Sequence, residues 1–134
     1  MKIAAKPVLF KAPVSLGADE YTAHLNQAEF VPTQPTASWT DLDGKVTNLG
    51  GPSSWVLVLA GAQDWSSVDT LVGFLDAHEG EEVVVTITDP SGAIHTGTVV
   101  CAAVTKGGTI NTPAAFSKAL PVNGKPETTY PVAP

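Results

Sequence analysis

Three histidines and a single cysteine are the side chains of this sequence best suited to metal binding or nucleophilic catalysis. His24, His78 and His95 lie far apart, and none has a second histidine or cysteine at the spacing of metal ligands. A zinc site needs three or four such groups, so the sequence predicts no metal site. Cys101 lies in the apolar run TVVCAAV, where we expect a buried thiol that acts as a small apolar side chain.

Short stretches rich in oxygen ligands or glycine could hold a cation or a phosphate, but each lacks essential partners. The stretch Asp41-Leu42-Asp43-Gly44 resembles the start of a calcium loop without the third oxygen ligand or the closing glutamate. The pairs Ser53-Ser54 and Ser66-Ser67 have no G-x-S-x-G setting, and the glycine pairs at 50–51 and 107–108 lack the lysine of a phosphate loop. We therefore expect turns or loops here and no cofactor.

Three tryptophans could form an aromatic surface that binds sugars: Trp39, Trp55 and Trp65. Tryptophan also contributes large apolar areas to protein cores and to subunit contacts. We favour this second role for at least two of the three.

The charge composition argues against a protein that grips nucleic acid. The chain has 13 acidic and 7 basic residues, a net charge of −6, and every basic residue is lysine. Arginine is the usual ligand for phosphate and guanine edges, and net negative charge repels a polyanion. These properties still suit a protein that DNA slides past. The acids gather between residues 41 and 89, where Lys45 is the single lysine.

Nothing at the N-terminus resembles a signal peptide, because no charged start is followed by a long apolar run. The longest apolar stretch, residues 55–62, is far too short to span a bilayer. We expect a soluble chain without membrane insertion.

Alternating and continuous apolar runs predict a mostly β chain with six or seven strands. The expected strands are residues 8–10, 21–33, 38–42, 55–62, 82–88, 93–105 and 115–122, with a further short stretch at 109–111. Two of them are joined by Asp89-Pro90-Ser91-Gly92, which has proline and glycine at the positions that a β-turn favours.

One amphipathic helix is expected at residues 67–78, lying on the sheet. Its apolar stripe consists of Val68, Leu71, Val72 and Leu75. Ser66 is the expected N-cap, with Asp69 completing a variant of the capping box. Gly80 can take the positive φ that often ends a helix.

The remaining segments indicate arms and a long loop around a single domain of 134 residues. Residues 1–19 and 123–134 are rich in proline and suggest extended N- and C-terminal arms, and residues 41–54 suggest a long loop between strands. The expected fold is a small β-sandwich or barrel with one flanking helix. Extended arms and a long loop are features that subunits use to reach neighbouring copies.

The order of several motifs over residues 55–126 adds a family resemblance. These motifs are W-x-L-x-x-x-G-x-x-x-W from Trp55 to Trp65, a short helix ending near Gly80, VVVTITDPSG, G-x-V at 97–99, KGG at 106–108 and ALPVNGKP at 119–126. In this order they resemble the tail tube, or major tail, proteins of long-tailed bacteriophages. The N-terminal half departs from the family pattern, which leaves the register of the first strands open.

The resemblance implies a structural virion protein without catalytic activity. Such proteins assemble as stacked hexameric rings, and the inner strands form a tube through which DNA passes without specific binding. The implied partners are further copies of the chain and other tail proteins at the tube ends. The implied location is the virion tail, after synthesis in the host cytoplasm.

Two groups of residues are the assembly contacts that the resemblance implies. The ring-stacking loop would contain Asp41, Asp43, Gly44, Lys45, Asn48, Gly50 and Gly51. The last strand and the C-terminal arm would contain Leu120, Val122, Asn123, Gly124, Lys125 and Pro126. Deletion of residues 41–54 or 123–134 is then expected to leave a folded monomer that no longer builds tubes.

Two other functional classes stay open on the sequence. One is a monomeric β-sandwich binding module, immunoglobulin-like or carbohydrate-binding, including a decoration protein on a capsid. The other is an enzyme of an unfamiliar β-barrel type with Asp64, His78 or His95 in a pocket. The enzyme would need two of these residues to converge, and their spacing gives no reason to expect that.

Overall fold

The computed structural model describes residues 13–17 and 19–131. Its elements, in chain order, are β1 (Val14–Leu16), β2 (Asp19–Glu20), the short 3-10 helix η1 (Thr22–His24), β3 (Leu25–Thr33), β4 (Thr36–Thr40), β5 (Val46–Gly50), β6 (Ser54–Ala62), α1 (Leu71–Ala77), β7 (Glu82–Thr88), β8 (Ile94–Val100) and β9 (Ala115–Thr129). The mostly β class with one α-helix is confirmed. The strand expected at 8–10 and most of the N-terminal arm lie outside the described residues.

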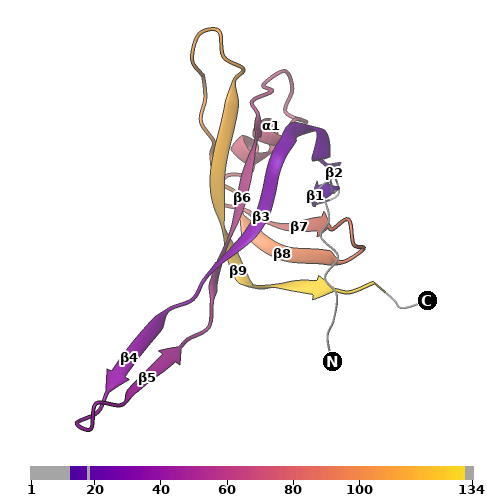
Figure 1. The fold of residues 1–134 in the computed structure, drawn as a ribbon. Coiled ribbons are helices and arrows are strands. Elements are labelled where there is room, and N and C mark those ends of the chain that lie inside the picture. The colour runs from indigo at the N-terminus through magenta and orange to yellow at the C-terminus, as the bar shows by residue number, and fades with distance from the viewer. Residues whose placement is uncertain (1–12, 18, 132–134) are drawn as a thin grey trace.

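Seven strands form one antiparallel sheet in the order β2-β1-β7-β8-β9-β6-β3, and β4 and β5 form a separate hairpin. The long strand β9 connects two parts of the sheet, because its residues 115–121 pair with β6 and its residues 122–129 pair with β8. The pairing is irregular between Asn123 and Glu127, and Gly124 there has φ +85°. Figure 1 shows β9 bending at this point, so that β7 and β8 run across the direction of β3 and β6.

The two parts of the sheet and α1 enclose one core. It contains Leu57 and Leu59 from β6, Val85 and Ile87 from β7, Val99 from β8, Phe116 and Leu120 from β9, and Leu71, Val72 and Leu75 from α1. Each element contributes alternate or helix-spaced apolar residues, as its pattern predicts. Burial of these side chains stabilises the body by about 1.5–3 kcal/mol each.

Several expected strands differ at their ends. β7 has the expected bounds, and the turn at 89–92 closes with a 2.9 Å hydrogen bond from the Gly92 N–H to the Asp89 carbonyl. Residues 22–24 form η1, so β3 begins at Leu25 rather than at residue 21. β8 ends at Val100, and residues 101–114 form a loop instead of continuing the strand.

The helix begins later than the sequence pattern predicts. Its N-cap is Thr70, whose hydroxyl accepts a hydrogen bond from the Gly73 N–H at 3.3 Å. The Ser66 hydroxyl instead donates to the Asp64 carboxylate at 2.6 Å, so Ser66 is not a cap. A Cβ on Gly73 would lie 2.6 Å from the Ser67 carbonyl oxygen, so the chain at residue 67 crosses the helix face rather than extending it.

The segment expected as a long loop, residues 41–54, is largely part of a hairpin. The strand expected at 38–42 is β4, which ends at Thr40, and it pairs with β5 from Thr36↔Gly50 to Thr40↔Val46. β5 has the sequence Val-Thr-Asn-Leu-Gly, and turn residues lie on both sides of it. It resembled a loop because none of its side chains is buried, so its sequence has no burial pattern typical of a strand. All five residues of β4 and all five of β5 are exposed.

The segment expected as a C-terminal arm is largely strand. Residues 123–129 belong to β9 and pair with β8, with Ile94 opposite Thr129 and Thr96 opposite Glu127. The last residues of the expected arm, 132–134, lie outside the described part of the chain.

Candidate assembly surfaces

The β4–β5 hairpin projects from the body as a finger (Figure 1). Its strand register places Ala37 opposite Leu49 and Trp39 opposite Thr47, and both pairs lie on one face because side chains alternate along a strand. The opposite face holds the pairs Ser38–Asn48 and Thr40–Val46, and the Ser38 hydroxyl donates to the Asn48 side-chain oxygen at 2.8 Å. The hairpin is therefore amphipathic, with one mainly apolar face.

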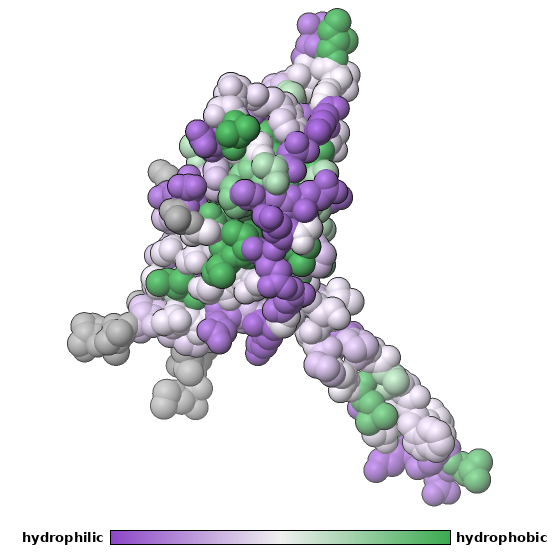
Figure 2. All heavy atoms as spheres, turned by 180° about the vertical axis from the view of Figure 1, so that it is seen from behind, coloured by the Kyte–Doolittle hydropathy of each residue, from purple (hydrophilic) through white to green (hydrophobic). Residues whose placement is uncertain are grey.

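The apolar face is open to solvent. The exposed fraction is 66% for Trp39 and 56% for Leu49. Such large apolar residues side by side on a projecting element are typical of an interaction surface. Figure 2 shows a hydrophobic patch partway along this finger and a second one at its far end, beside hydrophilic residues.

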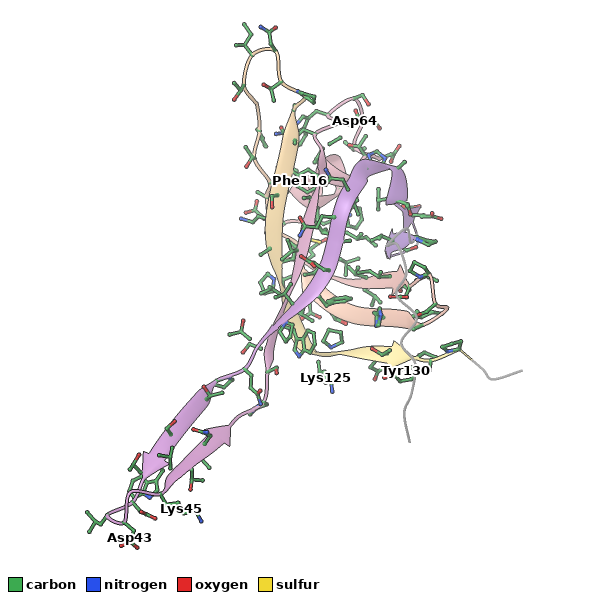
Figure 3. All side chains as sticks on the ribbon, in the orientation of Figure 1. Asp43, Lys45, Asp64, Phe116, Lys125 and Tyr130 are labelled. Atoms are coloured by element: carbon green, nitrogen blue, oxygen red, sulfur yellow. The ribbon has the colours of Figure 1, made fainter. Side chains whose placement is uncertain are left out.

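The turn at the end of the hairpin is built by Asp41. Its carboxylate accepts hydrogen bonds from the backbone N–H groups of Asp43 and Lys45, both at 3.0 Å, and Gly44 takes φ +86°. The Asp41 carboxylate therefore shapes the turn. Figure 3 shows Asp43 and Lys45 at this far end. Within the turn, Leu42 is fully exposed.

The other sequence-predicted loop residues lie at the base of the hairpin or on its polar face. Gly50 and Gly51 are at the base, where the Gln34 side chain donates to the Gly51 carbonyl at 3.0 Å. A Cβ on Gly50 would lie 2.9 Å from the Gln34 side-chain nitrogen. Asn48 lies on the polar face. The seven residues that were assigned to the ring-stacking loop therefore lie along the hairpin, but at its far end, on its polar face and at its base rather than in one cluster.

The second predicted group, in β9, divides into buried and exposed residues. Leu120 is fully buried in the core, Val122 packs against it, and Pro126 is buried next to Gly97 of β8. These three residues contribute to the packing of the body and are not part of an arm. The Asn123 side chain donates to the Glu82 carboxylate at 2.7 Å.

A groove of about 880 Å³ lies between the hairpin base and the bend of β9. Its lining includes Gln34, Pro52, Trp55 and Pro121, and its single charged residue is Lys125. Lys125 and Gly124 are exposed at this bend (Figure 3). The sequence assigned Gly124 and Lys125 to an assembly contact, but it gave no sign that they share a groove with the hairpin base.

A second projection stands at the other end of the molecule, where the sequence predicted a strand as far as residue 105 and a further short strand at 109–111 but the structure has a loop. Residues 105–114 form the outer part of the loop between β8 and β9, and all of them are exposed. The Gln63 side chain holds this loop, since it donates to the carbonyls of Gly107 at 2.8 Å and Ala115 at 2.6 Å and accepts from the Gly107 N–H at 3.0 Å. The KGG motif was the available signal, and it indicated only a turn.

A small polar cluster supports the same loop. The Lys106 ammonium lies 3.1 Å from the Asp76 carboxylate and 5.5 Å from the centre of the Trp65 ring. The Trp65 indole N–H donates to the Gln63 side-chain oxygen at 3.1 Å. The loop is therefore anchored to α1 and to the segment after β6. Because Trp65, Trp55 and Trp39 lie on different parts of the fold, they do not form one aromatic surface.

The candidate catalytic side chains have separate neighbours. His78 lies 3.4 Å from Glu81, and His95 lies 3.8 Å from Asp89 and 3.0 Å from the Thr128 hydroxyl. Asp64 interacts with Ser66, whose side-chain and backbone hydrogen bonds lower the pKa of the Asp64 carboxyl. The three candidates, Asp64, His78 and His95, do not share a pocket in the described part of the chain.

Metal and thiol chemistry have no visible site in the described residues. No group of three or more histidine, cysteine, aspartate or glutamate side chains there could hold a metal ion. Cys101 is 2% exposed, and burial followed by the charge of Glu81 raises the pKa of its thiol. None of the described helices is long and apolar enough to cross a membrane.

Comparison with solved structures identifies the fold. A chain in the virion of a native gene transfer agent particle superposes with a TM-score of 0.67 at 21% identity, covering 89% of this chain and 95% of that one. A chain in the tail of an empty gene transfer agent particle, which has C6 symmetry, gives a TM-score of 0.60 at 20% identity, covering 79% and 82%. This chain shares the fold of a chain in the gene transfer agent tail.

The same fold occurs in chains of two other tube-containing assemblies. A chain of the cap that terminates the tube of the anti-feeding prophage gives a TM-score of 0.60 at 13% identity, covering 98% of this chain and 95% of that one. A chain in the sheath–tube complex of an extracellular contractile injection system gives a TM-score of 0.57 at 16% identity, covering 92% of this chain and 90% of that one. No protein-family model and no curated protein sequence matches this chain. The likeness confirms the fold that the sequence resemblance implied.

Proposed function

We propose that this chain is a structural subunit that self-assembles into hexameric rings, which stack into a virion tail tube for the passage of DNA. The observation that carries the proposal is the amphipathic β4–β5 hairpin on a body that shares the fold of a chain in the gene transfer agent tail. An isolated two-stranded hairpin is marginally stable in water. A neighbouring copy that covers Trp39 and Leu49 would stabilise the hairpin and join two rings.

The charge of the chain is compatible with a DNA conduit. A net charge of −6 without arginine provides few groups that would hold a polyanion inside a channel. The subunit needs no cofactor and has no catalytic role in this proposal. Its partners are further copies of itself and other tail proteins at the tube ends.

Substitution of the apolar face tests the role of the hairpin. In a double variant, Trp39→Thr with Leu49→Thr, the strands keep a high β-propensity but lose their apolar area. We expect light scattering to show a folded monomer at concentrations at which the unchanged protein forms large assemblies. The matched control is Ser38→Thr with Asn48→Thr, which changes two paired positions on the opposite face and should still assemble.

Equal assembly of the two double variants would contradict a role for the apolar face. If the unchanged protein stayed monomeric at every concentration and bound a glycan or a capsid surface, a binding module would replace the tube subunit as the best description.

A further inference from the structure

The loop opposite the hairpin has the properties of a preformed contact. Gln63 fixes its two sides through Gly107 and Ala115, and the Thr112 N–H donates to the Thr109 carbonyl at 3.2 Å to close the tip. A loop that is ordered before binding loses less conformational entropy on association than a free loop does. Association through the tip of this loop therefore costs little additional conformational entropy.

The tip is uncharged, and Ile110 is its single large apolar side chain, between Thr109 and Asn111. Ile110 is 85% exposed, and no charged residue occurs between Lys106 and Lys118. Exposure of one isoleucine is common on protein surfaces. Here the side chain stands at the end of a loop that is held away from the body, where a neighbouring molecule can reach it.

The groove at the hairpin base has matching chemistry. Pro52, Trp55, Pro121 and Val122 provide apolar surface, and no acidic residue lines the groove. Two copies of a chain with net charge −6 repel each other at long range. An uncharged tip and a groove without acids are places where two copies can meet without burying like charges.

The tip and the groove lie at opposite ends of the β6–β9 strand pair. The pair runs from Val56↔Pro121 at the groove to Ala62↔Ala115 at the base of the loop. Six residue steps correspond to about 20 Å, so the tip cannot fill the groove of its own chain. The two projections point away from each other in both Figure 1 and Figure 2. Copies stacked head to tail would bring one tip to the next groove.

From these observations we infer that the Ile110 tip of one copy inserts into the groove at the hairpin base of the next copy along the tube. The inference rests on the proposed tube function and names a second contact between rings. The hairpin of the upper copy reaches down, and the loop of the lower copy reaches up beside it.

Cysteine cross-linking in assembled tubes tests this contact. The variant carries Ile110→Cys and Ser53→Cys, which place one thiol at the tip and one in the groove. Native Cys101 stays in place because its buried thiol is a poor reactant. After oxidation, a non-reducing gel should show a ladder of covalent oligomers, since each copy links to one neighbour above and one below. A control with Ile110→Cys and Val84→Cys, in the exposed part of β7, should give no ladder.

The outcomes separate the inference from the function on which it rests. Tubes without a ladder for the tip–groove pair would overturn the inference and leave the tube function intact. Failure of the unchanged protein to form rings or tubes would contradict both the tube function and the tip–groove contact.

A charge at the tip provides a second test. Ile110→Lys should raise the concentration required for assembly by about tenfold or more, because it places a second positive charge near Lys125 in a groove that is otherwise uncharged. Val68→Lys is the matched control, since Val68 is also aliphatic and 75% exposed. Equal effects of the two substitutions would contradict the inference.

Discussion

Single residues decide where α1 begins. The Thr70 hydroxyl accepts from the Gly73 N–H and donates to the Ser67 carbonyl at 2.9 Å, and Thr70 is 7% exposed. Ser66 has better capping statistics in the sequence, but its hydroxyl and its N–H are both engaged by Asp64. A sequence pattern cannot show this competition, because either serine or threonine can cap a helix.

The helix cap gives a direct prediction. Thr70→Ala should lower the free energy of unfolding by about 1 kcal/mol, because it removes the cap of a short helix whose apolar face is in the core. Ser66→Ala should cost less than about 0.5 kcal/mol, as expected for an exposed turn. Urea unfolding of both variants measures the difference. If Ser66→Ala lost more stability than Thr70→Ala, Ser66 would be the N-cap, as the sequence predicted.

The turn between β7 and β8 predicts a pH effect on stability. The Ser91 N–H and then the Ser91 hydroxyl lower the pKa of the Asp89 carboxyl, with smaller help from His95. A carboxyl with a lowered pKa in the folded state contributes stability that is complete above its unfolded pKa, near 3.8. That contribution is lost as the pH falls through the lowered value.

Asp89→Asn should therefore flatten the acid limb of the stability curve. We expect the urea midpoint to fall less between pH 7 and pH 3 in this variant than in the unchanged protein. Asp43→Asn, at the hairpin turn, is the control and should retain most of the acid sensitivity. An identical fall in Asp89→Asn and the unchanged protein would show that the turn makes no such contribution.

At the scale of elements, local patterns predicted the strands in the body better than the projecting segments. The continuous apolar run of β6, the β-branched run of β7 and the turn chemistry at 89–92 are local signals, and the structure follows them. The β4–β5 hairpin has no buried side chain, so its sequence carries no burial pattern that separates a strand from a loop. Its amphipathic register became visible only with the strand pairing.

In the sequence, the bend within β9 resembled the end of a strand. Asn123, Gly124 and Pro126 are turn residues, and the sequence analysis placed the start of the C-terminal arm at them. In the structure they occupy the irregular pairing between Thr98↔Asn123 and Thr96↔Glu127, where the strand passes from β6 to β8. A positive φ at glycine and a proline at irregular pairing are both tolerated in a bent strand. Knowledge of the partner strands was needed to distinguish a bend from a terminus.

Two deletions separate the structural role of β9 from the assembly role of the hairpin. Replacement of residues 36–50 by a short Asn-Gly turn should leave a folded body, because the Gly51 N–H already reaches the Pro35 carbonyl at 2.9 Å. Truncation before Asn123 should destabilise the body strongly, because β8 loses part of its pairing and buried Pro126 is removed. This replaces the sequence-based expectation that both deletions leave the monomer folded.

Circular dichroism and urea unfolding of the two deletions measure this contrast. A cooperative transition close to that of the full chain is expected for the hairpin deletion, and a lost or greatly shifted transition for the truncation. Two equally stable variants would mean that the second half of β9 is an arm after all.

At the scale of the whole molecule, the two projections make the two ends of the subunit different from each other. The hairpin with its apolar face and groove lies at one end, and the loop with Ile110 lies at the other (Figure 1). Different surfaces at opposite ends are what head-to-tail contacts need, whereas a two-fold dimer would pair a surface with itself. Sequence alone suggested partners through the resemblance to tail tube proteins, but the positions of the contact surfaces required the fold.

Electron microscopy of the concentrated, purified full chain tests self-assembly most directly. The images should show rings with six-fold symmetry and a central channel, and stacks of such rings as hollow tubes at higher concentration. The Trp39→Thr, Leu49→Thr variant, imaged in parallel, should show neither stacks nor tubes. Particles that stay monomeric, or that assemble without a channel, under every condition in which the chain is folded would contradict its role as a tail tube subunit.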